Sequence, residues 1–227
     1  MGNFFLSTGR KRAVQTHQPV TQPADRQNES NGMIFSLFNR IYRGHIMSFS
    51  QSYLDQTSQI AKSLDPEIIE NIAKGLSSLR ERNGRLFFIG SGGGAGHASH
   101  AVNDFRKIAN IECYTPTDNV SELTARINDD GWDTSYSNWL KVSRFNSNDG
   151  IFVFSVGGGS LEKNISVNLV ECIKMAKDMG SSIFGVVGKD GGFVKESSDD
   201  VVVIPTIDDK LITPHTEGWQ AVVWHAL

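Results

Sequence analysis

The sequence predicts an α/β fold, a three-layer sandwich in which a mostly parallel sheet is covered by helices on both faces. Two observations carry this prediction. Short, continuously apolar segments alternate with segments of helical periodicity, the pattern of strands buried on both sides. Two of these apolar segments also run directly into glycine-rich turns that open a helix. Consecutive units of strand, glycine turn and helix make the expected strands parallel.

The expected elements follow along the chain in a regular order. Apolar residues recur at helical spacing over residues 49–83, where Asp65 and Pro66 predict the start of a second helix. Strands are expected at residues 85–89, 151–154, 182–187 and 201–204. A helix is expected from about residue 161 to residue 179, and Gly180 predicts its end.

The chain of 227 residues is long enough for one well-buried domain. Residues 1–32 are polar and lack a hydrophobic period, so we expect residues 1–47 to be a disordered arm and residues 48–227 to form a single domain. The sequence ends inside an apolar helical stretch without a capping residue. We therefore expect the last helix to continue past Leu227 in a longer chain.

Composition limits the classes of partner. The 25 acidic and 22 basic residues give a net charge of −3 without a long basic block, so we expect neither a nucleic-acid partner nor a membrane partner. No segment has the roughly 20 apolar residues of a membrane-spanning helix. Cys113 and Cys172 lack metal-binding or redox spacing, which favours free thiols and a cytoplasmic protein.

Two glycine-rich loops are the candidate binding elements. Glycines let the backbone approach a ligand closely, and the amides of a following helix attract an anion. Both loops follow expected parallel strands, where the ligands of open α/β sheets collect, so we predict a phosphate site. The candidate binding residues are Gly90, Ser91, Gly92, Gly93 and Gly94 in the first loop and Ser155, Gly157, Gly158, Gly159 and Ser160 in the second.

Two other interpretations of the first loop remain open. A tight strand-to-helix turn needs glycines for its own packing. A dinucleotide fold begins in the same way, and Gly90, Gly92 and Ala95 fit a loose version of its motif. That fold also needs an acid about 20 residues later, for which Glu112 is a marginal candidate. The second glycine loop favours a sugar phosphate.

Four segments resemble the landmarks of a known family. FFIGSGGGAGHASHAVNDF, FVFSVGGGS, VVGKDGG and TEGWQAVVWH resemble, in order and spacing, the sugar isomerase (SIS) family, and within it the sedoheptulose 7-phosphate isomerases. The resemblance covers about residues 49–227. It implies a tetrameric aldose–ketose isomerase that acts on a phosphorylated sugar.

The resemblance also implies roles for particular residues. His100 and Asp104 occupy the positions of a family His and Glu, and Glu217 and His225 those of a family Gln and His. The resemblance implies that Asp104 is the base, that His225 is its acid partner, and that the four residues together hold a divalent metal, for which zinc is the expected ion. Asp in place of Glu and Glu in place of Gln are departures from the family pattern, and the shorter Asp104 places its carboxylate differently.

Helix geometry gives independent but weaker support. His100 and Asp104, four residues apart, share one helix face, as does His97 one turn earlier, although a solvated His/Asp ion pair is the alternative. Glu217 and His225 are separated by about 12 Å along a helix, too far for one ion. Either Glu217 precedes the helix or the two residues meet ligands from different subunits, which places the site at an oligomer interface.

The sequence therefore leaves three candidate functions open. The first is isomerisation of a seven-carbon sugar phosphate through an enediol, and the second is the same chemistry on another phosphosugar. The third is a non-catalytic, phosphosugar-binding regulatory relative. Asp129, in the stretch NDDGW, matches a family turn near the substrate, and a plain surface turn is the alternative. Retention of two histidines and two acids at the quartet favours an enzyme.

Overall fold

The computed structural model describes residues 47–227, so the arm expected at residues 1–47 lies almost wholly outside the described residues. Residues 52–227 form one compact unit. Its sheet has the order β2-β1-β3-β4-β5, and every pair of neighbouring strands is parallel. The strands are β1 (Leu86–Gly90), β2 (Cys113–Tyr114), β3 (Gly150–Ser155), β4 (Ser182–Val187) and β5 (Asp200–Val203).

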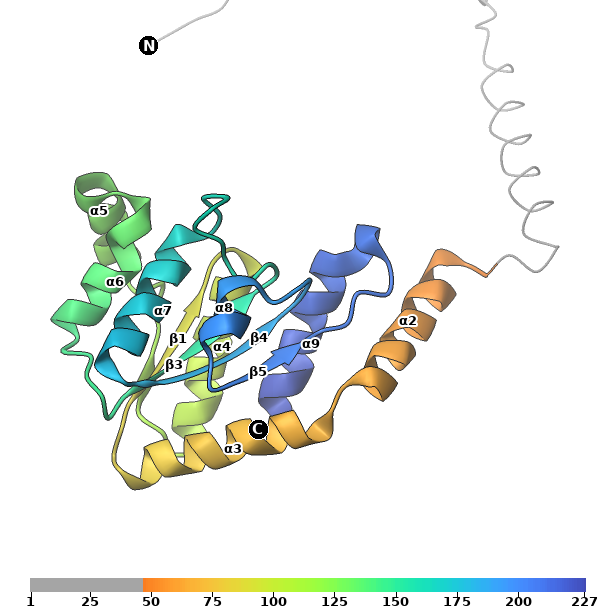
Figure 1. The fold of residues 1–227 in the computed structure, drawn as a ribbon, viewed down its shortest axis with the longest axis horizontal. Helices are drawn as coiled ribbons and strands as arrows, with labels where there is room; N and C mark the ends of the chain where they lie inside the picture. The colour runs from red at the N-terminus through yellow and green to blue at the C-terminus, as the bar shows by residue number, and fades with distance from the viewer. Residues whose placement is uncertain (1–46) are drawn as a thin grey trace, which may run out of the picture. The chain divides into compact units, whose positions relative to one another are not determined.

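Helices α2 and α3 precede the first strand, α4 to α8 fill the intervals between the strands, and α9 follows the last strand (Figure 1). They are α2 (Phe49–Ser63), α3 (Pro66–Glu81), α4 (Gly93–Lys107), α5 (Val120–Asp130), α6 (Trp132–Val142), α7 (Val167–Met179), α8 (Gly192–Ser197) and α9 (Ile212–Ala226), with a 3₁₀ turn at Asp209–Leu211. The start of α3 is as predicted, because Asp65 accepts a hydrogen bond from the Glu67 amide at 2.9 Å and Pro66 occupies the first turn.

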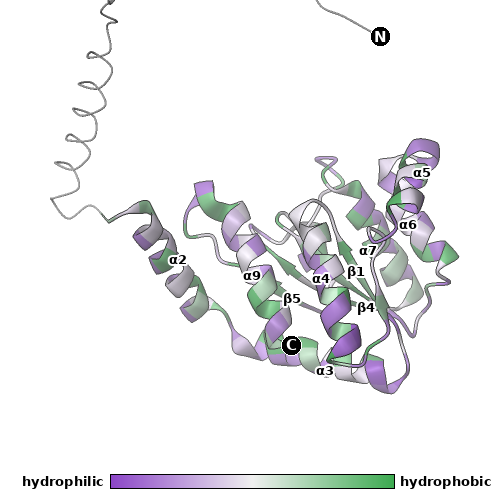
Figure 2. Ribbon diagram, turned by 180° about the vertical axis from the view of Figure 1, so that it is seen from behind, coloured by the Kyte–Doolittle hydropathy of each residue, from purple (hydrophilic) through white to green (hydrophobic). Residues whose placement is uncertain are grey.

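Alternation along the central strands divides the core between two faces of the sheet. Phe88 and Phe152 pack in one cluster with residues of α3, α4 and α9, whereas Phe87 and Ile151 pack in another with residues of α6, α7 and α8. Figure 2 shows the strands as predominantly hydrophobic and the covering helices as mixed. The predicted sandwich with helices on both faces is thereby confirmed.

Two local predictions need correction. The helix expected from residue 161 begins at Val167, because Ser160 and Ile165 exchange two backbone hydrogen bonds of 2.9 Å and close a tight loop. Ser166 then takes a left-handed backbone conformation (φ 50°), which prevents a continuous helix from residue 161. Strand β2 was not predicted, since two residues carry no readable periodicity.

Candidate active site

The sheet order places both glycine loops at one position. In a parallel sheet of order 2-1-3-4-5 the direction of winding reverses between β1 and β3, and ligands bind in the crevice beyond the carboxyl ends of those strands. A cavity of about 300 Å³ lies there. Its lining residues are Ser91, Gly94, Phe154, Ser155, Val156, Gly157, Ile165, Ser166, Leu169, Lys189, Thr213, Glu217 and Gln220.

Only some of the predicted binding residues line this cavity. Ser91, Gly94, Ser155 and Gly157 line it, whereas Gly159 and Ser160 line a neighbouring cavity of about 350 Å³. The lining of the first cavity does not include the other predicted residues, Gly90, Gly92, Gly93 and Gly158.

The first loop is covered by an acidic side chain. A Cβ at Gly93, the first residue of α4, would lie 2.5 Å from Oε1 of Glu217, so the Glu217 carboxylate packs directly on the Gly93 backbone. Carboxylates are stabilised at a helix N-terminus by the partial positive charge of its amides. The end of α4 that we expected to attract a phosphate therefore already faces an anion from α9.

The second loop is fixed by main-chain hydrogen bonds. The carbonyls of Val156, Gly158 and Gly159 accept hydrogen bonds of 3.0 Å from the amides of Gly188, Val194 and Phe193. In addition, the Gly158 amide donates to Ser155 Oγ at 3.0 Å. The loop after β3 and the turn after β4 consequently form one rigid wall of the cavity.

Three of the four predicted metal ligands come together on α4 and α9. Oδ2 of Asp104 lies 3.4 Å from Nε2 of His100 and 3.4 Å from Nε2 of His225, and one donor atom from each of the three lies within 4.8 Å of the others. The side chain of Asp104 is 19% exposed, and those of His100 and His225 are 57% and 53% exposed. We call these three residues the His/Asp cluster.

Hydrogen bonds orient the cluster. Nδ1 of His225 lies 2.7 Å from the Ala221 carbonyl oxygen, which can only accept, so Nδ1 carries a proton. In the neutral ring, Nε2 is then unprotonated and faces Asp104. Oδ1 of Asp104 accepts from Asn103 Nδ2 at 2.9 Å, so the carboxylate presents Oδ2 to the two imidazoles.

The fourth predicted ligand, Glu217, is not in the cluster. It lies inside α9, which rules out the expectation that it precedes the helix. Eight residues separate it from His225, about 12 Å along the helix, and it lines the cavity instead. Asp129 also differs from expectation: it is exposed in the last turn of α5, where Asn128 donates to it at 2.8 Å, and not in a turn.

The sequence prediction missed several residues between the two regions. The Gln220 side chain is fully buried, with Oε1 2.9 Å from Nδ1 of His97 and Nε2 3.3 Å from the Val186 carbonyl. Trp224 packs beside the rings of His97 and His100, at centroid distances of 5.1 and 5.4 Å. Lys189 lines the cavity and belongs to the VVGKDGG landmark, yet no role was assigned to it from sequence.

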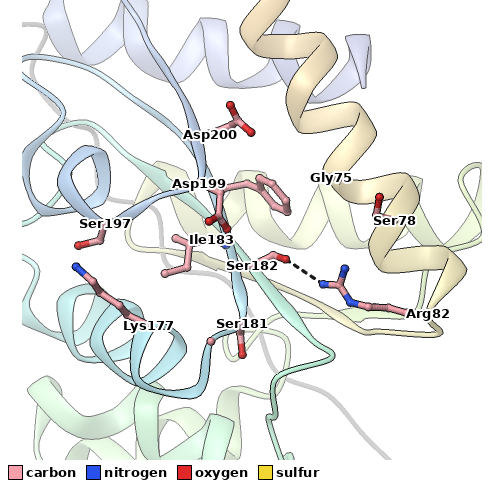
Figure 3. Close-up of a pocket in the computed structure, with 12 residues that line it drawn as sticks. Gly75, Ser78, Arg82, Lys177, Ser181, Ser182, Ile183, Ser197, Asp199 and Asp200 are labelled. Carbon is pink, nitrogen blue, oxygen red and sulfur yellow. Dashed lines mark hydrogen bonds between the residues drawn. The ribbon is translucent and has the colours of Figure 1, made fainter.

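A larger cavity, of about 510 Å³, lies at the opposite, amino ends of β4 and β5 (Figure 3). Its polar groups serve the fold: Arg82 donates to Ser182 Oγ at 2.9 Å, and Asp199 accepts from the Ile183 amide at 2.8 Å. Burial raises the pKa of Asp200, which also lines this cavity. This cavity lacks the glycine loops and lies at the end of the strands opposite to the crevice.

The two cysteines are free thiols inside the core. Burial raises the pKa of Cys113 to about 12 and also raises the pKa of Cys172. Neither thiol is therefore a nucleophile at neutral pH. Among residues 47–227, none of the helices combines the length and the apolar character needed to cross a membrane.

Known proteins provide independent comparisons. No family model matches the chain. The lincomycin biosynthesis protein LmbN of Streptomyces lincolnensis is 28% identical over 191 residues, which cover 80% of this chain and 68% of that protein. The phosphoheptose isomerase of Helicobacter pylori is 24% identical over 184 residues, 78% of this chain and 90% of the enzyme.

A solved structure shares the fold. The phosphoheptose isomerase of Neisseria gonorrhoeae superimposes with a TM-score of 0.66 at 20% identity, over 77% of this chain and 93% of that one. The resemblance found in the sequence is thereby confirmed: the chain is similar in sequence to phosphoheptose isomerases and shares the fold of one of them.

Proposed function

We propose that the protein is a sugar-phosphate isomerase that interconverts a ketose phosphate and an aldose phosphate through an enediol. The observation that carries this proposal is the Asp104 carboxylate, held between two imidazoles on α4 and α9. A carboxylate and an imidazole 3.4 Å apart can exchange protons with the adjacent carbon and oxygen of one sugar. Similarity to proteins named phosphoheptose isomerase supports a seven-carbon substrate, sedoheptulose 7-phosphate.

The proton transfers define the role of each residue. In the ketose, Asp104 removes a proton from C1 while the protonated His225 donates a proton to O2, which gives the enediol. His225 then accepts the proton of O1, and Asp104 returns its proton to C2, which gives the aldose. Atoms and charges balance, because one proton moves from C1 to C2 and one from O1 to O2.

The donor set of the cluster fits a divalent metal such as zinc. Zinc bonds of about 2.0 to 2.2 Å in a tetrahedral site place neighbouring ligand atoms about 3.4 Å apart. That is the separation of Asp104 Oδ2 from each imidazole. The Ala221 carbonyl fixes the tautomer that leaves His225 Nε2 available. Nε2 would either bind an ion or carry the proton that His225 donates to O2, so the two roles of His225 exclude each other. Such an ion would supply Lewis-acid polarisation of a substrate oxygen, and three protein ligands leave a fourth position open.

We further propose that a complete site combines two subunits of a homo-oligomer, as in the tetramer expected from the resemblance. None of the His/Asp cluster lines the cavity between the glycine loops. Asp104 lies ten residues beyond Gly94, which lines the cavity, about 15 Å along α4. An extended seven-carbon chain with its phosphate spans about 10 Å. We propose that the cavity of one subunit and the His/Asp cluster of another act on the same sugar.

The substrate test is incubation of the metal-loaded protein with a panel of five-, six- and seven-carbon ketose phosphates, with the aldose product detected by NMR. We expect conversion of sedoheptulose 7-phosphate. Conversion of another member of the panel alone would correct the substrate, and binding without conversion would indicate a regulatory phosphosugar-binding protein. Light scattering tests the assembly, and a monomer at micromolar concentration would contradict the shared site. The buried free thiols support a cytoplasmic location.

A further inference from the structure

We infer that Lys189, and not the N-terminus of α4, is the cationic anchor of the phosphate group. This inference rests on the proposed function for the identity of the ligand. Lys189 is the only cationic residue lining the 300 Å³ cavity in the part of the chain that the structure describes, and Glu217 is its only carboxylate. The cavity therefore has one wall that attracts an anion and one that repels it.

The repelling wall is the first glycine loop. Glu217 packs on Gly93 and places a negative charge at the start of α4. A phosphate at the same amides would stand against this carboxylate in a site partly shielded from water, where like charges repel more strongly than in bulk solvent. The carboxylate instead suits hydroxyl groups, which can donate hydrogen bonds to it. We therefore place the sugar hydroxyls on the Glu217 side.

The attracting wall is the second loop together with the turn after β4. Nζ of Lys189 lies 3.9 Å from the position that a Cβ of Gly157 would take, so the ammonium stands over a residue without a side chain. Within residues 47–227, the Gly157 amide makes no hydrogen bond. A free amide beside an ammonium is a combination that binds phosphate oxygens.

The backbone of Lys189 is held in place rather than free to move. Just before it, the Gly188 amide bonds the Val156 carbonyl, and after it the amides of Phe193 and Val194 bond the carbonyls of Gly159 and Gly158. Lys189 takes a left-handed conformation (φ 53°) between these anchors. It forms no salt bridge among the described residues, so no carboxylate there competes with a ligand.

Binding of inorganic phosphate and of sedoheptulose 7-phosphate by calorimetry tests the inference without turnover. We expect Lys189→Ala to weaken the binding of both ligands by about tenfold or more, because a charge-assisted hydrogen bond is lost. Lys189→Arg should retain most of the affinity for both ligands. The matched control is Lys195→Ala, which removes the same charge from an exposed position on α8 that does not line the cavity. We expect it to bind as wild type does.

The kinetic readout separates this role from a catalytic one. We expect Lys189→Ala to raise KM for the ketose phosphate about tenfold and to leave kcat within about twofold. Unchanged phosphate binding in Lys189→Ala would overturn the inference, as would a wild-type protein that binds neither ligand. A wild type that binds phosphate through Lys189 but isomerises no sugar would overturn the proposed function alone.

Discussion

The cavity between the glycine loops and the His/Asp cluster are built in different ways. Main-chain hydrogen bonds between the loop after β3 and the segment 188–194 hold the cavity, and Gly94 and Gly158 of its loops are packed against other backbone. The cluster consists of side chains on two helix surfaces, with His100 and His225 more than half exposed. The backbone of the fold therefore builds the cavity, whereas side chains on the surfaces of α4 and α9 build the cluster.

The largest effect should follow from removal of the proposed base, Asp104. We expect Asp104→Asn to lower kcat by about 10²- to 10⁴-fold, the range for loss of a general base. Because Asn has nearly the same size and shape as Asp, the midpoint of urea unfolding should stay close to that of wild type. The matched control is Asp178→Asn, which removes an acid on α7 remote from both regions. An equal loss of activity in that control would show a non-specific charge effect.

The second prediction concerns metal binding by the cluster. His100→Ala and His225→Ala should each weaken zinc binding by at least about 10- to 100-fold, since loss of a ligand costs at least as much as loss of an outer-shell partner. His97→Ala is the control, because His97 lies one turn earlier on α4 but bonds Gln220 instead. Metal analysis after dialysis should find zinc in wild type and in this control. Wild-type protein without metal would leave Asp104 and His225 as a purely acid–base pair.

The third prediction tests the main-chain construction of the cavity with two glycines of the same backbone conformation. Gly158 and Gly180 both have φ 68°, but a Cβ at Gly158 would collide with the Gly191 carbonyl, whereas one at Gly180 meets nothing within 4 Å. Gly180→Ala should therefore cost only the left-handed backbone strain, about 1 kcal/mol of unfolding free energy. Gly158→Ala should cost about 1–3 kcal/mol more and lose phosphate binding as well. Equal losses of stability in the two variants would contradict this construction.

The smallest effect concerns His215, which lies on the same helix as Glu217 and His225 but belongs to neither region. Its ring stacks on Tyr53 at 4.3 Å, and its Nε2 donates to Gln56 Oε1 at 2.8 Å. Burial lowers the pKa of His215, and Asp208 opposes this in part. The folded state therefore binds this proton less readily than the unfolded state does.

The sign of the resulting pH dependence follows directly. Above the unfolded pKa of about 6.5 the ring is neutral in both states and its contribution to stability is complete. As the pH falls below that value, the unfolded state takes up the proton first, and stability decreases until the folded pKa is passed. Urea unfolding between pH 7.5 and 5 should show a shallower decrease for His215→Phe than for wild type. If the stability of the two proteins decreases equally with falling pH, His215 is not the source of the pH dependence.

Local sequence signals predicted the cavity better than the cluster. A strand that leads into a glycine turn and then a helix is a contiguous pattern, so β1, β3 and the loops after them were recognisable from sequence. The order of the strands, and hence the meeting of the two loops, depends on long-range pairing. The loop at residues 160–165 was missed because it closes through backbone hydrogen bonds that many sequences can make.

The cluster was predicted only through the family resemblance and helical spacing. His100 and Asp104 are four residues apart, but their meeting with His225 depends on how α4 packs on α9. The packing of α9 on α4 also places Glu217 beside Gly93 instead of in the cluster. A side chain eight residues from His225 faces a different part of α4. Lys189 was overlooked because its position over Gly157 follows from hydrogen bonds between two distant loops.

Solvent deuterium incorporation tests most directly whether the two regions act on one sugar. Wild-type protein and Asp104→Asn are incubated in D₂O with sedoheptulose 7-phosphate and, separately, with unphosphorylated sedoheptulose, and exchange at C1 and C2 is followed by NMR. We predict rapid exchange only for the wild type with the phosphorylated sugar, because the cavity must bind the phosphate and Asp104 must move the proton. Exchange by Asp104→Asn at the wild-type rate, or equal exchange in sedoheptulose, would contradict the account.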